Sequence, residues 1–312
     1  MKSEIPELQT LILGMRAAFD RGENAMEYAR QVLDQGVNLP MATLIAYDLQ
    51  AGSYVDYAKS NPDLNRNWCS QLAAILARFL GEECSLLEVG CGEATTLAGV
   101  INELPIKPTM AYGFDMSWSR CEVGNSWLSH KQVTATLFVA DLFSIPLGDH
   151  SIDLVYTSHS LEPNGGREEE ALRELLRIAK RAVVLIEPIY ELASPMAQQR
   201  MKHHGYVRNL KEIAERMGYT VAEYRLLEHI SNPLNPSGSL VIEKDCKGLP
   251  AEIGWRCPIT KTCLTPMGDL YYSEQSGLAY PLLRGIPLLR SEHSIVASRI
   301  GGASKLSVEN QG

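Results

Sequence analysis

Apolar residues in the first part of the chain recur every three or four positions, which is the spacing of one face of an α-helix. This spacing predicts two helices over residues 4–35, separated by a break near Gly22, and another helix over residues 41–50. An amphipathic stretch over residues 68–80, followed by Gly81, predicts a further helix with a glycine stop. The N-terminal region is therefore expected to be helical.

Short apolar runs alternate with helical patterns from residue 85 onward. Strands are expected at 85–89, 110–114, 136–139, 152–157 and 182–186, with helices at 95–104, 117–129, 206–217 and after residue 168. Two further strands, 221–227 and 239–243, end the series. Repeated βα units followed by a pair of strands predict an α/β fold with a doubly wound, Rossmann-like sheet.

Changes in pattern divide the chain into four parts. The alternation of strands and helices ends near Lys244, and the last residues are polar and contain adjacent glycines. We expect an N-terminal helical region (1–67), the α/β domain (68–245), a small α+β module (246–291) and a flexible tail (292–312).

Composition limits the partners and the compartment. A net charge of −8 argues against broad binding to nucleic acid or to an anionic membrane. No run approaches the ~18 apolar residues of a membrane span, and the sequence opens without the apolar core of a signal peptide. The seven cysteines, an odd number, suggest reduced thiols. We therefore expect a cytoplasmic protein, with a homo-oligomer left open.

The stretch from Leu86 to Leu97 contains an acidic residue, Glu88, followed by the close glycines Gly90 and Gly92. Such a turn between a strand and a helix can bind a ligand, because glycine accepts positive φ and leaves the backbone bare. A structural turn without a ligand is the alternative. Glu88 would repel a pyrophosphate but suits a ligand with an amino group or hydroxyls. The G-x-G-x-x-G pattern of nicotinamide enzymes fits less well, because Thr95 replaces its third glycine.

Two more acids stand at expected strand ends, where ligands of open parallel sheets bind. Asp115 follows the second strand, 27 positions after Glu88 (115 − 88), a spacing that suits ribose hydroxyls. Asp141 follows the third strand, where it can accept a hydrogen bond from an adenine amino group while Leu142 packs on the ring. Each acid alone is more often a solvated helix cap. Three acids in this order are harder to explain as helix caps alone.

These motifs, together with the segments 140–147 and 151–162, resemble class I S-adenosylmethionine-dependent methyltransferases over residues 68–243. The resemblance implies S-adenosylmethionine as the cofactor and a methyltransferase activity. Its candidate cofactor contacts are Glu88, Gly90, Gly92, Asp115, Met116, Asp141, Leu142, Ser158 and Tyr54. Tyr54 enters because many such enzymes fold an N-terminal segment with tyrosines over the cofactor, although a tyrosine here also suits an ordinary interface.

His159, at the mouth of the fourth strand, is the best candidate for a general base, and a structural loop histidine is the alternative. Family members that act on small molecules often have a second histidine one residue after Glu162, whereas this chain has Pro163. The role of that histidine therefore does not transfer. The acceptor stays unknown, with oxygen favoured over nitrogen and with either a small molecule or a peptide or other macromolecule as substrate. A non-catalytic cofactor-sensing or scaffold protein is the alternative function.

Residues 253–291 resemble the small zinc-ribbon-like activator subunit of tRNA, rRNA and release-factor methyltransferases. The likeness rests on the segments 278–281 and 285–287. A zinc ribbon needs two C-x-x-C pairs, but Thr260 stands three positions after Cys257 and the later pair is absent. We therefore expect no metal in this module.

Overall fold

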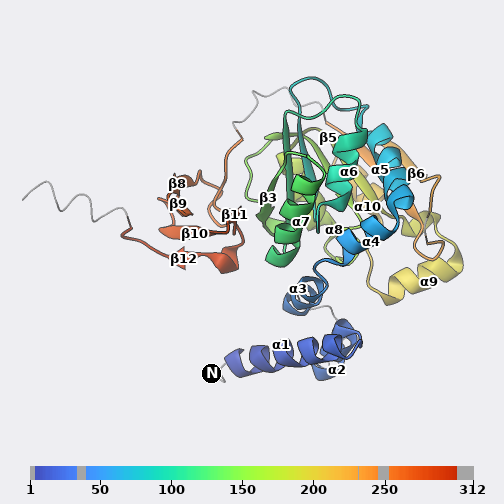
Figure 1. The fold of residues 1–312 in the computed structure, drawn as a ribbon. Coiled ribbons are helices and arrows are strands. Elements are labelled where there is room, and N and C mark those ends of the chain that lie inside the picture. Colours follow the sequence, from blue (N-terminus) through green and yellow to red (C-terminus); the bar gives the residue numbers. More distant parts are fainter. Residues whose placement is uncertain (1–3, 34–39, 231, 245–252, 301–312) are drawn as a thin grey trace, which may run out of the picture.

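The computed structural model of the chain is built on a seven-stranded sheet with the order β3-β2-β1-β4-β5-β7-β6 (Figure 1). The structure describes residues 4–33, 40–230, 232–244 and 253–300. Neighbouring strands are parallel, except that β7 runs antiparallel to β5 and β6. The strands are β1 (Ser85–Val89), β2 (Met110–Asp115), β3 (Thr136–Val139), β4 (Ile152–Ser158), β5 (Ala179–Pro188), β6 (Val221–Leu226) and β7 (Ser237–Glu243).

Helices cover both faces of this sheet, which confirms the predicted doubly wound α/β class. One face packs against α5 (Pro62–Leu76), α6 (Thr95–Glu103) and α7 (Trp118–His130). The other face packs against α8 (Glu168–Ile178) and α10 (Leu210–Arg216). All five residues of β1 are buried, as expected for a central parallel strand between two helical layers.

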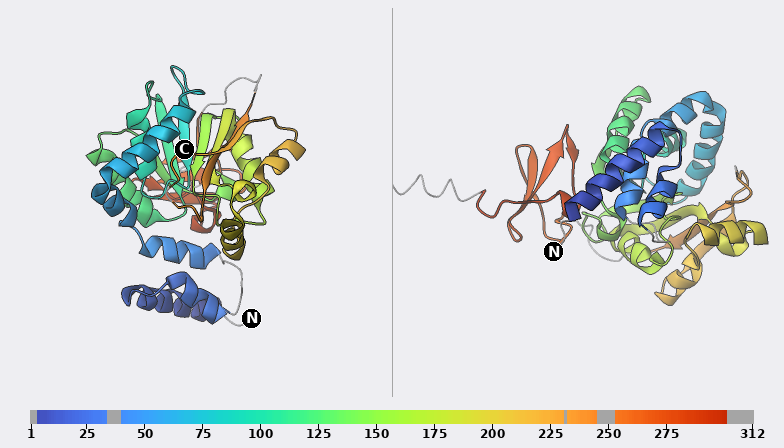
Figure 2. Two further views of the ribbon diagram at one scale, coloured as in Figure 1. Left: turned by 90° about the vertical axis from the view of Figure 1, so that its right-hand side faces the viewer. Right: turned by 90° about the horizontal axis from the view of Figure 1, so that it is seen from below.

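The N-terminal helices form a layer of their own, with a separate small apolar core. They are α1 (Glu4–Asp20), α2 (Ala25–Leu33), α3 (Pro40–Leu49) and α4 (Ser53–Ser60). Figures 1 and 2 show α1 and α2 away from the sheet, with α3 between them and α7. Asp48 of α3 accepts hydrogen bonds from the hydroxyls of Ser117 and Ser119 at 2.7 and 3.0 Å, which fixes α3 to the start of α7.

Several elements begin where the sequence pattern did not predict them. The helices α4 and α9 (Pro195–His203) were not expected, because each buries only two residues and has no long apolar stripe. The helix α5 starts at Pro62, six residues before the expected start at residue 68 (68 − 62), because proline suits the first helical position. The boundary expected after residue 67 therefore falls within a helix.

A small β module follows the main domain. It contains β8 (Thr265–Met267), β9 (Leu270–Ser273), β10 (Leu278–Leu283), β11 (Ile286–Pro287) and β12 (Ile295–Val296). The expected small C-terminal module is present, and its described part, residues 253–300, is built from strands without an α-helix. β12 lies within the stretch expected to be a tail. The rest of that tail, from residue 301, is outside the described residues.

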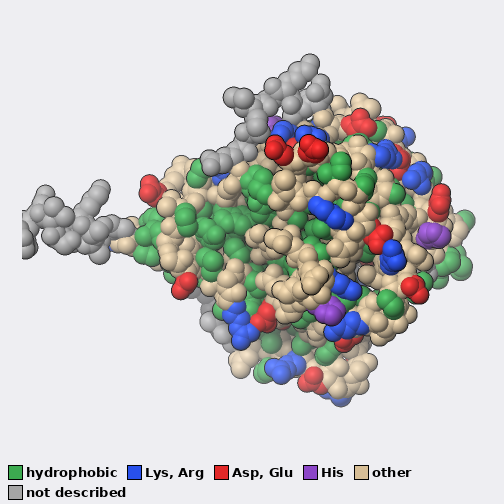
Figure 3. All heavy atoms as spheres, turned by 45° about the horizontal axis from the view of Figure 1, so that its top comes forward, with side chains coloured by type: hydrophobic (Ala, Val, Ile, Leu, Met, Phe, Trp, Pro, Cys, Tyr) green, Lys and Arg blue, Asp and Glu red, His purple; other side chains and the backbone are tan. Residues whose placement is uncertain are grey.

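Two further observations concern membrane spans and surface charge. No helix within the described ranges is long and apolar enough to cross a membrane. On the face shown in Figure 3, Lys and Arg side chains are interspersed with Asp and Glu. No broad basic surface appears on that face of the described residues.

Candidate active site

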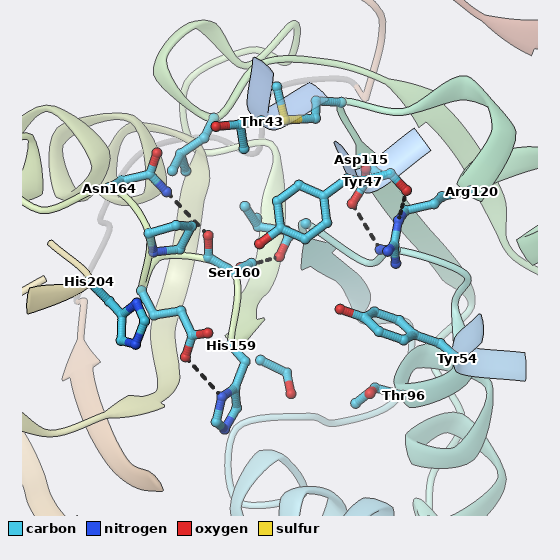
Figure 4. Close-up of a pocket in the computed structure, with 18 of the residues that line it drawn as sticks. Thr43, Tyr47, Tyr54, Thr96, Asp115, Arg120, His159, Ser160, Asn164 and His204 are labelled. Atoms are coloured by element: carbon cyan, nitrogen blue, oxygen red, sulfur yellow. Dashed lines mark hydrogen bonds and ion pairs between the residues drawn. The ribbon is translucent and has the colours of Figure 1, made fainter. Parts of the chain in front are cut away.

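A cavity of about 1550 Å³ opens at the carboxyl ends of β1, β2, β3 and β4 (Figure 4). Each of these strand ends contributes lining residues, and the N-terminal helices, the turn after α9 and the β module supply others. The strand order reverses between β1 and β4, which lie side by side. Ligands of open α/β sheets bind at such a reversal, so the cavity is the candidate active site.

Gly90 and Gly92 form the turn between β1 and α6, with φ of 66° and 52°. A Cβ on Gly90 would lie 2.3 Å from the Cβ of Ser160, so a larger residue has no room there. On the cavity side, a Cβ on Gly92 would lie 3.4 Å from the ring of Tyr54 and 3.5 Å from Nη1 of Arg120. The turn therefore presents bare backbone to the cavity.

Two strand-end acids line the cavity and brace its backbone. Asp115 accepts hydrogen bonds from the N–H groups of Gly92 at 3.0 Å and Ser117 at 2.9 Å. Burial raises the pKa of Asp115, and these two N–H groups and Arg120 oppose that effect. Asp141 accepts from the N–H of Phe143 at 2.9 Å. Both carboxylates keep unused acceptor capacity, because each oxygen has two lone pairs.

Glu88, in contrast, lies beneath the glycine turn and does not line the cavity. Its side chain is only 2% exposed, and its Oε2 has no hydrogen-bond partner among the described residues. Burial raises its pKa to about 8, although the Tyr156 hydroxyl and the Leu97 amide nearby oppose the effect. The sequence predicted a direct ligand contact for Glu88, but Glu88 is not among the residues that line the cavity.

Glu93, in the turn itself, holds the N-terminus of α4. Its carboxylate accepts hydrogen bonds from the N–H groups of Gly52 at 2.9 Å and Val55 at 2.8 Å. α4 has no capping side chain of its own, because Gly52 stands at its N-cap. A carboxylate from 38 or more residues away therefore satisfies the free donors of this helix.

Arg120 of α7 is the buried partner of Glu93, and the sequence pattern did not identify it as a site residue. It is 1% exposed, and its Nη1 lies 3.7 Å from Glu93, also fully buried. Its Nε donates to the carbonyl of Tyr47 at 2.8 Å, and its guanidinium lies 4.3 Å from the centre of the Tyr54 ring. Its Nη2 has no hydrogen-bond partner among the described residues, although Arg120 lines the cavity. Such a buried, unpaired donor suits an anionic group of a ligand.

His159 follows β4 and has both ring nitrogens engaged. Nδ1 lies 3.1 Å from Oε2 of Glu162, and Nε2 lies 2.7 Å from Oγ of Ser237. Burial lowers the pKa of His159, but the hydrogen bond to Glu162 and the negative charges of Glu162 and Glu187 raise it more, so the net shift is upward. A protonated ring can donate to both neighbours at once.

Glu187 ends β5 and holds the backbone of the loop that carries His159. It accepts from the N–H groups of Ser160, Leu161 and Glu162 at 3.1, 3.1 and 3.2 Å. Its side chain is 2% exposed, and burial raises its pKa to about 7. Glu187 therefore positions the loop from below and does not line the cavity.

The part of the cavity beyond this loop is rich in basic side chains. Its lining residues from α2, the start of α8 and the end of α9 include Arg30, Arg167, Lys202, His203 and His204. Burial lowers the pKa of His204, and the positive charges of Arg200, His203 and Arg30 lower it further. The neutral form of His204 is therefore favoured, and the positive charge of this region comes from Arg30, Lys202 and Arg167, the last of which also pairs with Glu170 at 2.7 Å.

Most of the predicted site residues meet at this cavity. It is lined by Gly90, Gly92, Asp115, Met116, Asp141, Leu142, Ser158, His159 and Tyr54. Only Glu88 among the predicted set lies elsewhere. No group of three or more His, Cys, Asp or Glu side chains suited to a metal occurs in the described part of the chain.

Comparisons with known proteins agree with this reading of the fold. Residues 86–182 match the family described as a methyltransferase domain. No curated protein matches the chain. The structure resembles a magnesium protoporphyrin IX methyltransferase from Synechocystis, solved with bound S-adenosylhomocysteine, at 15% identity and a TM-score of 0.47, over 74% of this chain and 98% of that one.

Two further solved structures are similar at the same low level. A complex of the Haloferax volcanii Trm112 methyltransferase activator with a methyltransferase matches at 20% identity and a TM-score of 0.47, over 60% of this chain and 81% of that one. The [4+2]-cyclase SpnF matches at 19% identity and a TM-score of 0.42, over 51% of this chain and 59% of that one. These likenesses concern the fold alone.

The family match, the glycine turn and the strand-end acids together define the class of the protein. Residues 86–182 match a methyltransferase domain, and this match supports methyltransferase activity with S-adenosylmethionine as the cofactor. The match does not include the β module. Its resemblance to an activator subunit stays a prediction.

Proposed function

We propose that this enzyme methylates a carboxylate oxygen of a small acidic molecule. The observation that carries the proposal is the group of basic side chains in the cavity beyond the loop after β4, which includes Arg30, Arg167 and Lys202. Positive groups that converge in a partly enclosed cavity favour an anionic ligand. A small molecule is favoured over a macromolecule because the N-terminal helices and the loop after β4 enclose the site.

The residues that line the other half of the cavity fit the methyl donor. The bare turn at Gly90 and Gly92 leaves room for its amino acid part, and the buried Nη2 of Arg120 suits its carboxylate. Asp115 and Met116 would hold the ribose side, and Asp141 and Leu142 the adenine side, with Ser158 and Tyr54 completing the contacts. Glu88 does not line the cavity, and we assign it no contact with the ligand.

The size of the cavity is consistent with two ligands at once. A pocket for one drug-sized ligand measures roughly 300–1000 Å³, whereas this cavity measures about 1550 Å³. When bound, S-adenosylmethionine supplies a methyl group on a positively charged sulfur. The protein then has to orient the acceptor oxygen and keep water away, and orientation alone can contribute several kcal/mol.

A carboxylate acceptor is consistent with the hydrogen bonds that occupy both ring nitrogens of His159. A carboxylic acid is ionised at neutral pH, so no base has to remove a proton from it before methylation. Both nitrogens of His159 are already engaged, by Glu162 and Ser237, and neither is free to act as a base in this arrangement. We infer that His159 contributes positive charge and position near the acceptor.

The second candidate is a protein that binds the cofactor and senses it without catalysis. The engaged nitrogens of His159 also suit this function, because they leave the loop after β4 without a free histidine base. The two candidates differ in turnover. Cofactor binding without methyl transfer to any acceptor class would favour the sensor.

The experiment is to incubate the enzyme with S-adenosylmethionine labelled in its methyl group and panels of small carboxylic acids, phenols, alcohols and amines. We expect label in carboxylic acids, and we expect alkali to release it as methanol, which distinguishes an ester from an ether or a methylamine. Alkali-stable label would overturn carboxylate methylation. Label in peptides but not in small acids would overturn the small-molecule assignment.

A variant tests the role of the basic side chains. Lys202→Ala should raise KM for the acidic acceptor about three- to fivefold, the effect of one exposed charge pair, with little change in kcat. The matched control is Lys211→Ala, because Lys211 pairs with Glu215 on α10 and does not line the cavity. Equal KM values in the two variants would contradict an anionic acceptor at this wall.

A further inference from the structure

The β module docks along the free edge of the main sheet. In Figure 1, β11 lies next to β3. Leu288 and Val139 form a parallel bridge, and the N–H of Leu289 donates to the carbonyl of Val139 at 2.8 Å. The indole N–H of Trp118 donates to the carbonyl of Leu283 at 3.3 Å. The module therefore continues the sheet by a short parallel segment.

The parallel direction of this segment brings the module to the cavity. Arg290 comes two residues after Leu288, just as Asp141 comes two residues after Val139. Both Arg290 and Asp141 line the cavity. The β module thus contributes a cationic side chain at the end of β3, where the acid predicted to meet the adenine also lies.

Arg290 is buried without adequate partners in the protein. Its residue is 6% exposed, and its Nε is a buried donor with no hydrogen-bond partner among the described residues. Its Nη2 reaches Glu292 at a distance of 3.4 Å, and that carboxylate is 56% exposed. A buried charged donor without an acceptor is costly, so a ligand atom that accepts from Nε would stabilise the arrangement.

We propose that the β module completes the cofactor site, with Arg290 donating from Nε to an acceptor atom of the adenosine part of the methyl donor. This inference rests on the proposed cofactor position beside Asp141 and Leu142. Adenine ring nitrogens and ribose oxygens are acceptors, and the planar guanidinium can also stack on the base. The module then belongs to the active site and is not only a cover for the sheet edge.

The test is calorimetric binding of S-adenosylhomocysteine, which needs no acceptor and no turnover. Arg290→Ala should weaken binding about tenfold or more, because it removes a charged hydrogen bond. Arg290→Met keeps the length of the side chain and removes the donors, so it should show a similar loss if the alanine variant is unstable. Arg299→Ala is the matched control, because Arg299 is an exposed arginine of the same module outside the cavity.

A second ligand separates the possible outcomes. 5′-Methylthioadenosine has the adenosine part but no amino acid part, so Arg290→Met should weaken its binding by a similar factor. A loss confined to S-adenosylhomocysteine would overturn the assignment to adenosine, and so would binding within twofold of wild type for both ligands. Failure of the wild-type protein to bind S-adenosylhomocysteine would instead contradict the proposed cofactor site as a whole.

Discussion

The imidazole of His159 lies between a carboxylate and a hydroxyl, and this determines its charge. Glu162 favours the protonated ring by a hydrogen bond and by its negative charge, and together with Glu187 it outweighs the effect of burial. The oxygen of Ser237 can accept from the other nitrogen. Protonated His159 therefore adds a positive charge to the side of the cavity where we propose the acceptor binds.

Replacing Glu162 by Gln should lower the pKa of His159, because the ring loses its charged partner. The pKa can be measured by NMR titration of the imidazole proton, with exposed His130 as an internal reference. For an acidic acceptor, kcat/KM should fall as pH rises through the pKa of His159, and the fall should occur at lower pH in Glu162→Gln. An unchanged pKa, or activity that rises with pH in this range, would instead indicate a neutral histidine base.

Residues at strand ends were predictable from sequence, whereas their partners were not. Asp115, Asp141 and His159 each follow a strand that the apolar pattern identifies, and parallel strands bring such residues to one edge. Glu93 and Arg120 depend on contacts with residues 47–55, and no local pattern encodes contacts at that separation. Glu88 has the right spacing, but burial between β2 and β4 removes it from the cavity.

At the scale of elements, α4 depends on the main domain for its N-terminus. Gly52 supplies no capping side chain, and α4 itself buries only Val55 and Ala58. Such a short helix is marginal without tertiary contacts. The carboxylate of Glu93 provides the missing cap, and Arg120 neutralises the buried charge. α4 carries Tyr54 over the glycine turn, so these contacts also position one wall of the cavity.

Replacing Glu93 by Ala should therefore destabilise the protein by about 3–5 kcal/mol, because it leaves Arg120 as an uncompensated buried charge. Urea unfolding measures this loss, and amide exchange should increase across residues 52–60. Glu103→Gln is the control, because its pair with Arg66, which is 73% exposed, contributes about 0–1 kcal/mol and its hydrogen bond from Ser70 about 1 kcal/mol. Equal losses in the two variants, or unchanged exchange in α4, would contradict the capping role of Glu93.

The number of apolar residues that an element buries explains which elements the sequence could predict. The strands β1 and β3 have the predicted bounds, because continuous apolar runs are specific to buried strands. α9 buries only Ala197 and Met201, so its sequence lacks the stripe by which helices are recognised. The β module was expected to be α+β because short strands carry a weak signal. Its contact with β3 could not be predicted from either segment alone.

At the scale of the whole molecule, buried carboxyl groups make stability depend on pH. Glu88 and Glu187 lie near the carboxyl ends of β1 and β5, the two strands on either side of β4, and burial raises their pKa values to about 8 and about 7. A carboxyl group in the unfolded chain has a pKa of about 4.3. The folded protein therefore binds more protons than the unfolded chain between these values, and its stability falls as pH rises through that range.

Glu88→Gln isolates this effect, because the amide stays neutral at every pH. We expect wild type to lose on the order of 2 kcal/mol of unfolding free energy between pH 6 and pH 8.5 relative to this variant. The measurement is urea unfolding of both proteins across that range. Carboxyl groups with lowered pKa values, such as Asp153 and Glu223, lose their contribution only at lower pH and do not affect the comparison. Parallel pH profiles for the two proteins would mean that Glu88 is ionised in the folded state. A buried carboxylate would then lie in β1 without a charged partner among the described residues, and its ionisation would lower the stability of the fold.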